Sequence, residues 1–177
     1  IKYVPAVEVA FHRGLWSFVF LFLILLCYTK INDFFKIFYS IKKIIVLSIT
    51  ALLISINWTG FIFSVSIDKV QDASMGYFIT PMISISLGYF FINEKFNIFK
   101  IISVILMLVA IIFLFSNTKT FPYLALIIGT TWGIYGLLRK KIDVSPPVGL
   151  LYECFFISLF SFPYLIYIHC KGYGYFI

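Results

Sequence analysis

The chain has 177 residues, of which 62% are hydrophobic and 12% are charged, and its mean hydropathy is +1.05. Soluble domains are about half apolar and about a quarter charged, so this composition excludes an ordinary soluble protein and predicts a polytopic membrane protein. The net charge of +7 does not indicate nucleic-acid binding, because the basic residues lie between apolar segments, where positive charge sets membrane topology.

Six apolar segments are long enough to cross a bilayer, and membrane-spanning segments of this kind are helical, so an all-α fold is predicted. Segment 30–43, between the first two, is basic and amphipathic and is expected to form a helix at the membrane surface. The predicted spans are residues 5–29, 44–67, 73–93, 98–115, 122–138 and 146–168.

The third and fifth spans carry small residues at four-residue steps. Such a stripe lets two helix backbones approach closely in lipid, where packing holds helices together. Pro81 lies in the middle of the third span and removes a backbone hydrogen bond, which predicts a kink. The helix-packing positions expected from this pattern are Gly76, Thr80, Ser84 and Gly88 in the third span and Gly129 and Gly133 in the fifth.

The second span is expected to contact other helices. Its middle holds the polar pair Asn57-Trp58; asparagine needs a hydrogen-bond partner in lipid, and tryptophan is unusual away from the interface. This pair lines either a cavity on a substrate path or a contact between helices. Tyr77 in the third span is a candidate of the same kind. A separate face, predicted to meet another helix, is formed by Ser48, Ser55, Thr59 and Ser66.

Ionisable side chains near the start of the first span are candidates for a substrate path. Glu8, His12 and Trp16 share one helical face, and Arg13 follows His12. Charged groups in a span are costly and usually face a cavity or one another. The alternative is an interfacial helix end, in which Glu8 caps the helix dipole, Arg13 reaches the headgroups and Trp16 anchors the interface.

Glu153 in the last span is the sharpest candidate. It lies six residues after Pro147, within an otherwise apolar stretch, where an unpaired carboxylate is expensive. Either it faces a cavity with a functional role, or it is a neutral, hydrogen-bonded structural carboxyl.

No enzyme motif is present: the sequence lacks a phosphate-binding P-loop, a His-Glu-x-x-His zinc motif and a Gly-x-Ser-x-Gly elbow. With two histidines in all, a histidine metal cluster is not expected. Cys27, Cys154 and Cys170 form no Cys-x-x-Cys pair and are interpreted as free thiols. The sequence therefore predicts a protein that is not an enzyme and has no metal or cofactor.

The distribution of lysine and arginine among the loops predicts how the chain is oriented in the membrane. Loops 30–43, 93–100 and 139–147 hold nine lysines and arginines, and the other side holds five, which places these three loops in the cytoplasm. The first residue then lies outside. This favours a chain that lacks one helix at its start, and an even number of spans with both ends outside is the alternative.

Several blocks of the sequence, in order along nearly the whole chain, resemble the RarD-type branch of the EamA-family drug/metabolite transporters. Two positions depart from the family pattern: Thr80 stands where asparagine is usual, and Asn93 where glycine is usual. The blocks are Glu8–Arg13 with Trp16-Ser17, Asn57-Trp58, Ala73–Pro81, Asn93–Phe96, Tyr135–Lys140 and Leu151–Glu153.

The resemblance implies a bacterial inner-membrane permease of ten helices in two inverted five-helix repeats, of which this chain holds helices two to seven. Residues 1–118 are then the first repeat without its first helix, and 119–177 the start of the second. The expected partners are the lipid bilayer, a small-molecule solute, and another copy or a complementing chain. The expected path residues are Glu8, His12, Arg13, Trp16, Asn57, Trp58, Tyr77, Thr80 and Glu153.

Two functions follow from these observations. The first is alternating-access transport of a small organic solute, with Glu153 or His12 as a proton carrier. The second is a non-transporting membrane protein, either an inactive remnant or a half that assembles with another chain, because an inverted-repeat transporter builds its site between both repeats.

Overall fold

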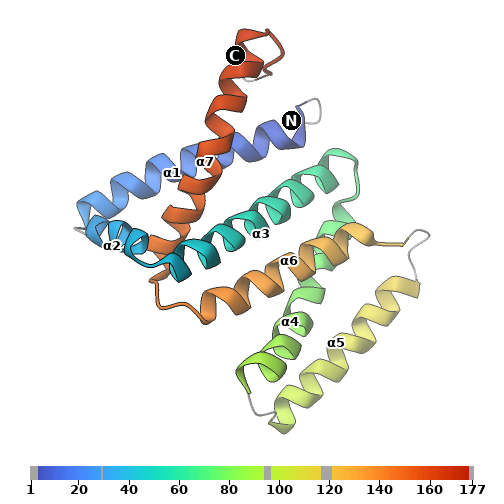
Figure 1. Ribbon diagram of the computed structural model, residues 1–177. Coiled ribbons are helices and arrows are strands. Elements are labelled where there is room, and N and C mark those ends of the chain that lie inside the picture. Colours follow the sequence, from blue (N-terminus) through green and yellow to red (C-terminus); the bar gives the residue numbers. More distant parts are fainter. Residues whose placement is uncertain (1–3, 29, 94–96, 117–120, 176–177) are drawn as a thin grey trace. The chain divides into compact units, whose positions relative to one another are not determined.

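The computed structural model describes residues 4–28, 30–93, 97–116 and 121–175, and within these ranges every regular element is a helix (Figure 1). Each of the six predicted spans is a helix, and segment 30–43 contains a further short one. The elements are α1 (Ala6–Cys27), α2 (Ile31–Lys36), the 3-10 turn η1 (Ile37–Tyr39), α3 (Ile41–Ser66), α4 (Val70–Ile92), α5 (Ile98–Ser116), α6 (Tyr123–Lys140) and α7 (Pro146–Cys170).

Five of these helices, α1, α3, α4, α5 and α7, are long and apolar enough to cross a membrane. The prediction of an all-α polytopic membrane protein is therefore confirmed. The helix predicted as the fifth span, α6, forms but is less apolar, because it contains three glycines and two threonines and ends in Arg139 and Lys140.

The chain divides into two compact units. The first comprises residues 1–55 and 139–177, and the second comprises residues 56–138, so α3 and α6 each run through both. The family resemblance implies a different division, into two sequence repeats at residue 118, and this division stays a prediction.

In the first unit, α7 crosses α1 (Figure 1), and the two helices approach closely at Gly14. A Cβ atom on Gly14 would lie 2.6 Å from Cγ2 of Ile157, so only glycine fits without a shift. Segment 30–43 contributes two residues to the core of this unit, whereas its Phe35, Phe38 and Ile41 are exposed, so its place at the membrane surface stays a prediction. Phe34 of α2 and Ile37 of η1 join the core formed with Leu25, Leu47, Val148, Leu151 and Tyr152.

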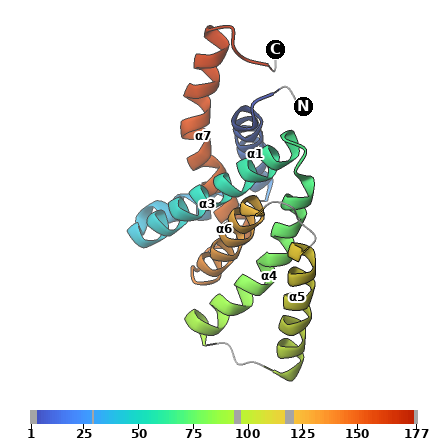
Figure 2. The ribbon, with the colours of Figure 1, turned by 90° about the vertical axis from the view of Figure 1, so that its right-hand side faces the viewer.

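In the second unit, α4 and α5 lie side by side (Figure 2), and α4 also packs closely against α6. The core here consists of Met75, Ile79, Ile111 and Ala125. Helix α4 continues through Pro81, which lies at the exposed side. It ends at Asn93, which adopts the left-handed conformation with φ 56°. That conformation accounts for the glycine usual in the related family, because glycine and asparagine adopt it at the least cost.

Candidate functional site

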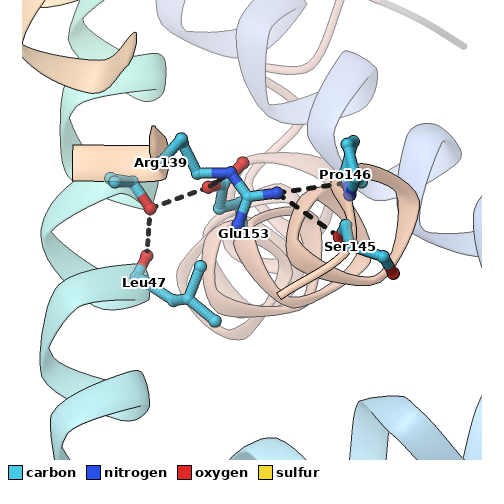
Figure 3. A network of polar contacts seen from close by, with 6 residues as sticks. Leu47, Arg139, Ser145, Pro146 and Glu153 are labelled. Atoms are coloured by element: carbon cyan, nitrogen blue, oxygen red, sulfur yellow. Dashed lines mark hydrogen bonds and ion pairs between the residues drawn. The ribbon is translucent and has the colours of Figure 1, made fainter. Parts of the chain in front are cut away.

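The Glu153 carboxylate of α7 is fully buried and is bound by two other segments of the first unit (Figure 3). Thr50 Oγ1 of α3 lies 2.7 Å from Glu153 Oε1, and Arg139 Nε at the end of α6 lies 3.7 Å from the same oxygen. A buried carboxylate needs such partners, since its desolvation is otherwise uncompensated. Thus α3, α6 and α7 meet at one buried acid.

Arg139 is fixed by more than its ion pair. Its Nη2 donates to the carbonyl oxygens of Ser145, at 3.5 Å, and Pro146, at 3.3 Å, at the start of α7 (Figure 3). The guanidinium group lies against Gly149, in the space that a side chain there would fill. The side chain is only 12% exposed. Arg139 therefore links the end of α6 to the start of α7 and also forms an ion pair with Glu153.

The Thr50 hydroxyl has one hydrogen to donate and lies within hydrogen-bond distance of two acceptor atoms. Its hydroxyl lies 3.0 Å from the Leu47 carbonyl oxygen and 2.7 Å from Glu153 Oε1. A hydroxyl donates one hydrogen and accepts through its lone pairs. An ionised Glu153 accepts a hydrogen bond from the Thr50 hydroxyl, whereas a protonated Glu153 donates one to Thr50 Oγ1, which then donates to the Leu47 carbonyl oxygen. The same geometry therefore serves both protonation states of Glu153 without loss of a hydrogen bond at the carboxyl group.

The neighbouring Tyr152 links α7 to α3 as well, because its hydroxyl lies 3.2 Å from Ser48 Oγ. The rest of the polar face predicted on the second span is less buried than the adjacent face, which contains Thr50, Asn57 and Ser64. Ser55 Oγ and Ser66 Oγ bond instead to carbonyl oxygens of their own helix. Hydroxyl groups satisfied in this way do not require a second helix.

The candidates on α1 separate into buried and exposed positions. Glu8 is buried, and its Oε1 accepts a hydrogen bond of 2.9 Å from the backbone N–H of Tyr175. His12 is half-buried, while Arg13 and Trp16 are exposed on the described surface. Along the predicted common face, the exposure of the side chains thus increases from the buried Glu8 to the exposed Trp16.

In the second unit, Asn57 connects α3 to α6. Its Nδ2 donates to the Ile128 carbonyl oxygen at 2.9 Å and to Thr131 Oγ1 at 3.2 Å. This geometry is that of the contact between helices, one of the two interpretations left open by the sequence. Trp58 is half-buried, and Tyr77 is exposed with its ring centroid 6.0 Å from that of Phe61. Thr80 Oγ1 donates its one hydrogen to the Gly76 carbonyl oxygen and so has none left to donate to another group.

Three of the predicted packing glycines lie where α4 meets α6. A Cβ atom on Gly76 would lie 3.1 Å from the Ala125 carbonyl oxygen, one on Gly129 3.0 Å from that of Gly76, and one on Gly133 2.6 Å from Ile83 Cγ2. Gly88 is buried near the end of α4, and Ser84 is exposed. The small residues therefore allow the α4 and α6 backbones to approach closely.

A profile of the EamA-like transporter family matches residues 1–116. The chain belongs to this family. Within it, the relatives place the chain in the RarD-type branch, as the sequence blocks predicted.

Protein RarD of Escherichia coli strain K12 is 35% identical to this EamA-family chain over 153 residues, which cover 86% of the chain and 52% of that protein. The uncharacterized transporter YojE of Bacillus subtilis is 32% identical over 170 residues, covering 94% of the chain and 57% of YojE. An uncharacterized transporter of Vibrio cholerae is 33% identical over 165 residues, covering 93% and 55%. The chain thus spans little more than half the length of these relatives, and no solved structure matches it.

Sequence reasoning missed several groups of this EamA-family chain. The sequence patterns mark Arg139 as a topology charge and as part of a family block, and they single out neither Thr50 nor Asp72. A signal was available for Thr50, since Thr50, Asn57 and Ser64 recur every seven residues and so share a helical face. No local signal links Arg139 to Glu153, because the connection depends on how the turn between α6 and α7 folds.

Proposed function

We propose that this chain forms part of a permease that moves a small organic solute across the membrane by alternating access, with Glu153 as the proton carrier. The observation that carries the proposal is the fully buried Glu153 carboxyl, held by Thr50 and Arg139 from two other helices. Ionisable groups inside a span are costly and typically mark ion and proton pathways. Membership of a transporter family supports the same function.

The Thr50 geometry supports proton coupling in particular. A carrier group has to be stable with and without its proton, and the Thr50 hydroxyl offers Glu153 a partner in either state. Arg139 pairs with Glu153 while Glu153 is ionised, and this ion pair is lost when Glu153 takes up a proton. No covalent chemistry on a substrate is part of this function, so the protein is proposed not to be an enzyme.

The proposed location is the bacterial inner membrane, with loops 30–43, 93–100 and 139–147 in the cytoplasm. The excess of lysine and arginine in these loops supports this orientation. Glu153 then lies about 10 Å along α7 from its cytoplasmic start at Pro146, at 1.5 Å per residue. Single-cysteine labelling from either side of the membrane tests the orientation.

Flux measurements on the natural full-length protein in vesicles test the function. We expect a pH gradient to drive uptake of at least one solute from a broad panel of small organic molecules. We expect Glu153→Gln to abolish the response to the gradient, because glutamine cannot ionise. Control vesicles carry Glu94→Gln, which removes an acid at the predicted cytoplasmic end of the third span. Flux that is unchanged in Glu153→Gln would refute the proton-carrier role.

A second candidate function is a membrane protein that transports nothing by itself and assembles with another copy or a complementing chain. The observation that favours it is the wide apolar surface of α5, where Leu106, Val109 and Phe113 are all exposed. Lipid or a second chain would cover this face. Cross-linking through cysteines placed at these three positions in native membranes tests for a partner chain on this face, since lipid cannot yield a cross-linked protein dimer.

A further inference from the structure

The first turn of α4 contains a buried carboxylate, Asp72, one of whose oxygens has no hydrogen-bond donor among the described residues. Asp72 is 8% exposed, and its Oδ2 is enclosed yet accepts no hydrogen bond within the described part of the chain. Leaving a buried anion without a donor is expensive, so such a group favours a cationic partner. In the local turn, the backbone N–H of Asp72 donates to the Lys69 carbonyl oxygen at 3.1 Å.

The packing register places Asp72 near the start of α6. Along the contact between α4 and α6, Gly76 faces Ala125, Ile79 faces Gly129 and Ile83 faces Gly133, so the two helices run in the same direction. Asp72 lies one turn before Gly76 on the same buried face of α4. Tyr123 lies two residues before Ala125. The acid and the tyrosine therefore belong to the same end of this helix pair.

Tyr123 already binds a cation within the chain. The Lys69 ammonium lies 5.1 Å from the centroid of its ring, which is the geometry of a cation–π interaction. The tyrosine is 45% exposed, so its ring is accessible from outside. An aromatic face and a carboxylate are the two groups that proteins use to recognise organic cations.

We propose that Asp72 and Tyr123 bind the cationic group of a small organic molecule, a quaternary or protonated amine, and that Lys69 is an internal occupant which this ligand displaces. A metal ion fits less well, because no group of three histidine, cysteine, aspartate or glutamate side chains is assembled among the described residues. The proposal rests on the proposed function only in taking the ligand to be a transported solute, and the binding itself does not require transport.

Calorimetric titration of the natural full-length protein in detergent micelles tests the site with benzyltrimethylammonium. The neutral control ligand is neopentylbenzene, which has the same shape without the charge. We expect the cation to bind and the neutral compound not to. Asp72→Asn should weaken binding by about tenfold or more, since it removes the counter-charge. The matched control is Asp68→Asn, which removes the same charge from an exposed position four residues away and should leave binding unchanged.

Substitutions at two further positions keep the test decisive if Asp72→Asn fails to fold. Tyr123→Leu should weaken binding about fivefold, whereas Tyr123→Phe retains the ring and should bind within about twofold of the natural protein. Lys69→Gln should tighten binding about threefold, because it removes the internal competitor. Equal binding of neopentylbenzene, unchanged binding in Tyr123→Leu, or weaker binding in Lys69→Gln would overturn the proposal.

The outcome is separable from that of the proposed function. If the protein transports a solute but its binding of benzyltrimethylammonium does not depend on Asp72 and Tyr123, this site is refuted and the transport function stands. Binding that depends on them, in a protein without flux, refutes the transport function and leaves the site intact.

Discussion

The guanidinium group of Arg139 occupies the space that a Cβ atom on Gly149 would fill. From this position Arg139 reaches both the Glu153 carboxylate and the carbonyl oxygens at the start of α7. The ion pair in the buried site therefore depends on the absence of a side chain one turn away along α7.

Gly149→Ala should displace Arg139 and destabilise the protein by about 1 to 3 kcal/mol, the usual cost of forcing an extra carbon into a packed site. The control is Gly136→Ala, because a Cβ atom there has nothing within 4 Å in the described structure. That change should be neutral or stabilise α6 by up to about 1 kcal/mol. Chemical denaturation in detergent measures both, and equal stability of the two variants would contradict the packing of Arg139.

Thr50→Val should destabilise the protein by about 1 to 3 kcal/mol, because it keeps the shape of the side chain and leaves a buried Glu153 oxygen without its closest donor. Thr50→Ser retains the hydroxyl and should lose markedly less. The double variant Thr50→Val with Glu153→Leu should recover part of the loss, since no buried acceptor remains. Strictly additive effects of the two substitutions would argue against the hydrogen bond.

Asn57→Leu should weaken the contact between α3 and α6 by about 1 to 2 kcal/mol, the range of polar contacts between membrane helices. Thr131→Val removes only the longer of the two hydrogen bonds of Asn57 and should cost less. If Asn57 instead lines the substrate path, flux will fall in Asn57→Leu while its stability matches that of the natural protein.

Gly129→Ala should disturb the α4–α6 contact more than Gly133→Ala does. The nearest obstacles to a Cβ atom on Gly129 include the backbone oxygen of Gly76 at 3.0 Å, which cannot move aside without shifting α4. The obstacles at Gly133 are mainly side-chain atoms of Ile83. The pair Gly133→Ala with Ile83→Ala should therefore restore packing, whereas Gly129→Ala with Ile79→Ala should not. Apparent melting temperatures of the four variants provide the comparison.

The exposed pair Asp33–Lys36 on α2 should give a small, pH-dependent contribution to stability. The hydrogen bond from Lys36 and its positive charge lower the pKa of Asp33 below the ordinary value of 3.8. A lowered folded-state pKa means that the stabilisation is present above the ordinary value and is lost as the pH falls through the lowered one. The natural protein should therefore melt slightly above Asp33→Asn at pH about 6 and together with it at pH about 2. A constant difference would contradict the assignment.

The sequence by itself determined the membrane class, the all-helical fold and the family. These properties follow from composition, from the length of the apolar segments and from short blocks of residues, all of which are local. The pattern of small residues also indicated which helices approach closely, since backbones can only meet where side chains are small, as at Gly76 and Gly129. The conformation of Asn93 at the end of α4 likewise matches a position where glycine is usual.

Only the tertiary structure decided which polar side chains meet. Thr50 and Glu153 are separated by 103 residues, and Asn57 and Ile128 by 71, so no periodicity within one helix can pair them. The identity of Glu153 as a costly buried acid was readable, but its partners depend on the rotation of α3 and on the turn that brings Arg139 back onto α7. Buried polar groups must be satisfied wherever the fold places them, and for that reason their partners are set by packing between helices rather than by sequence.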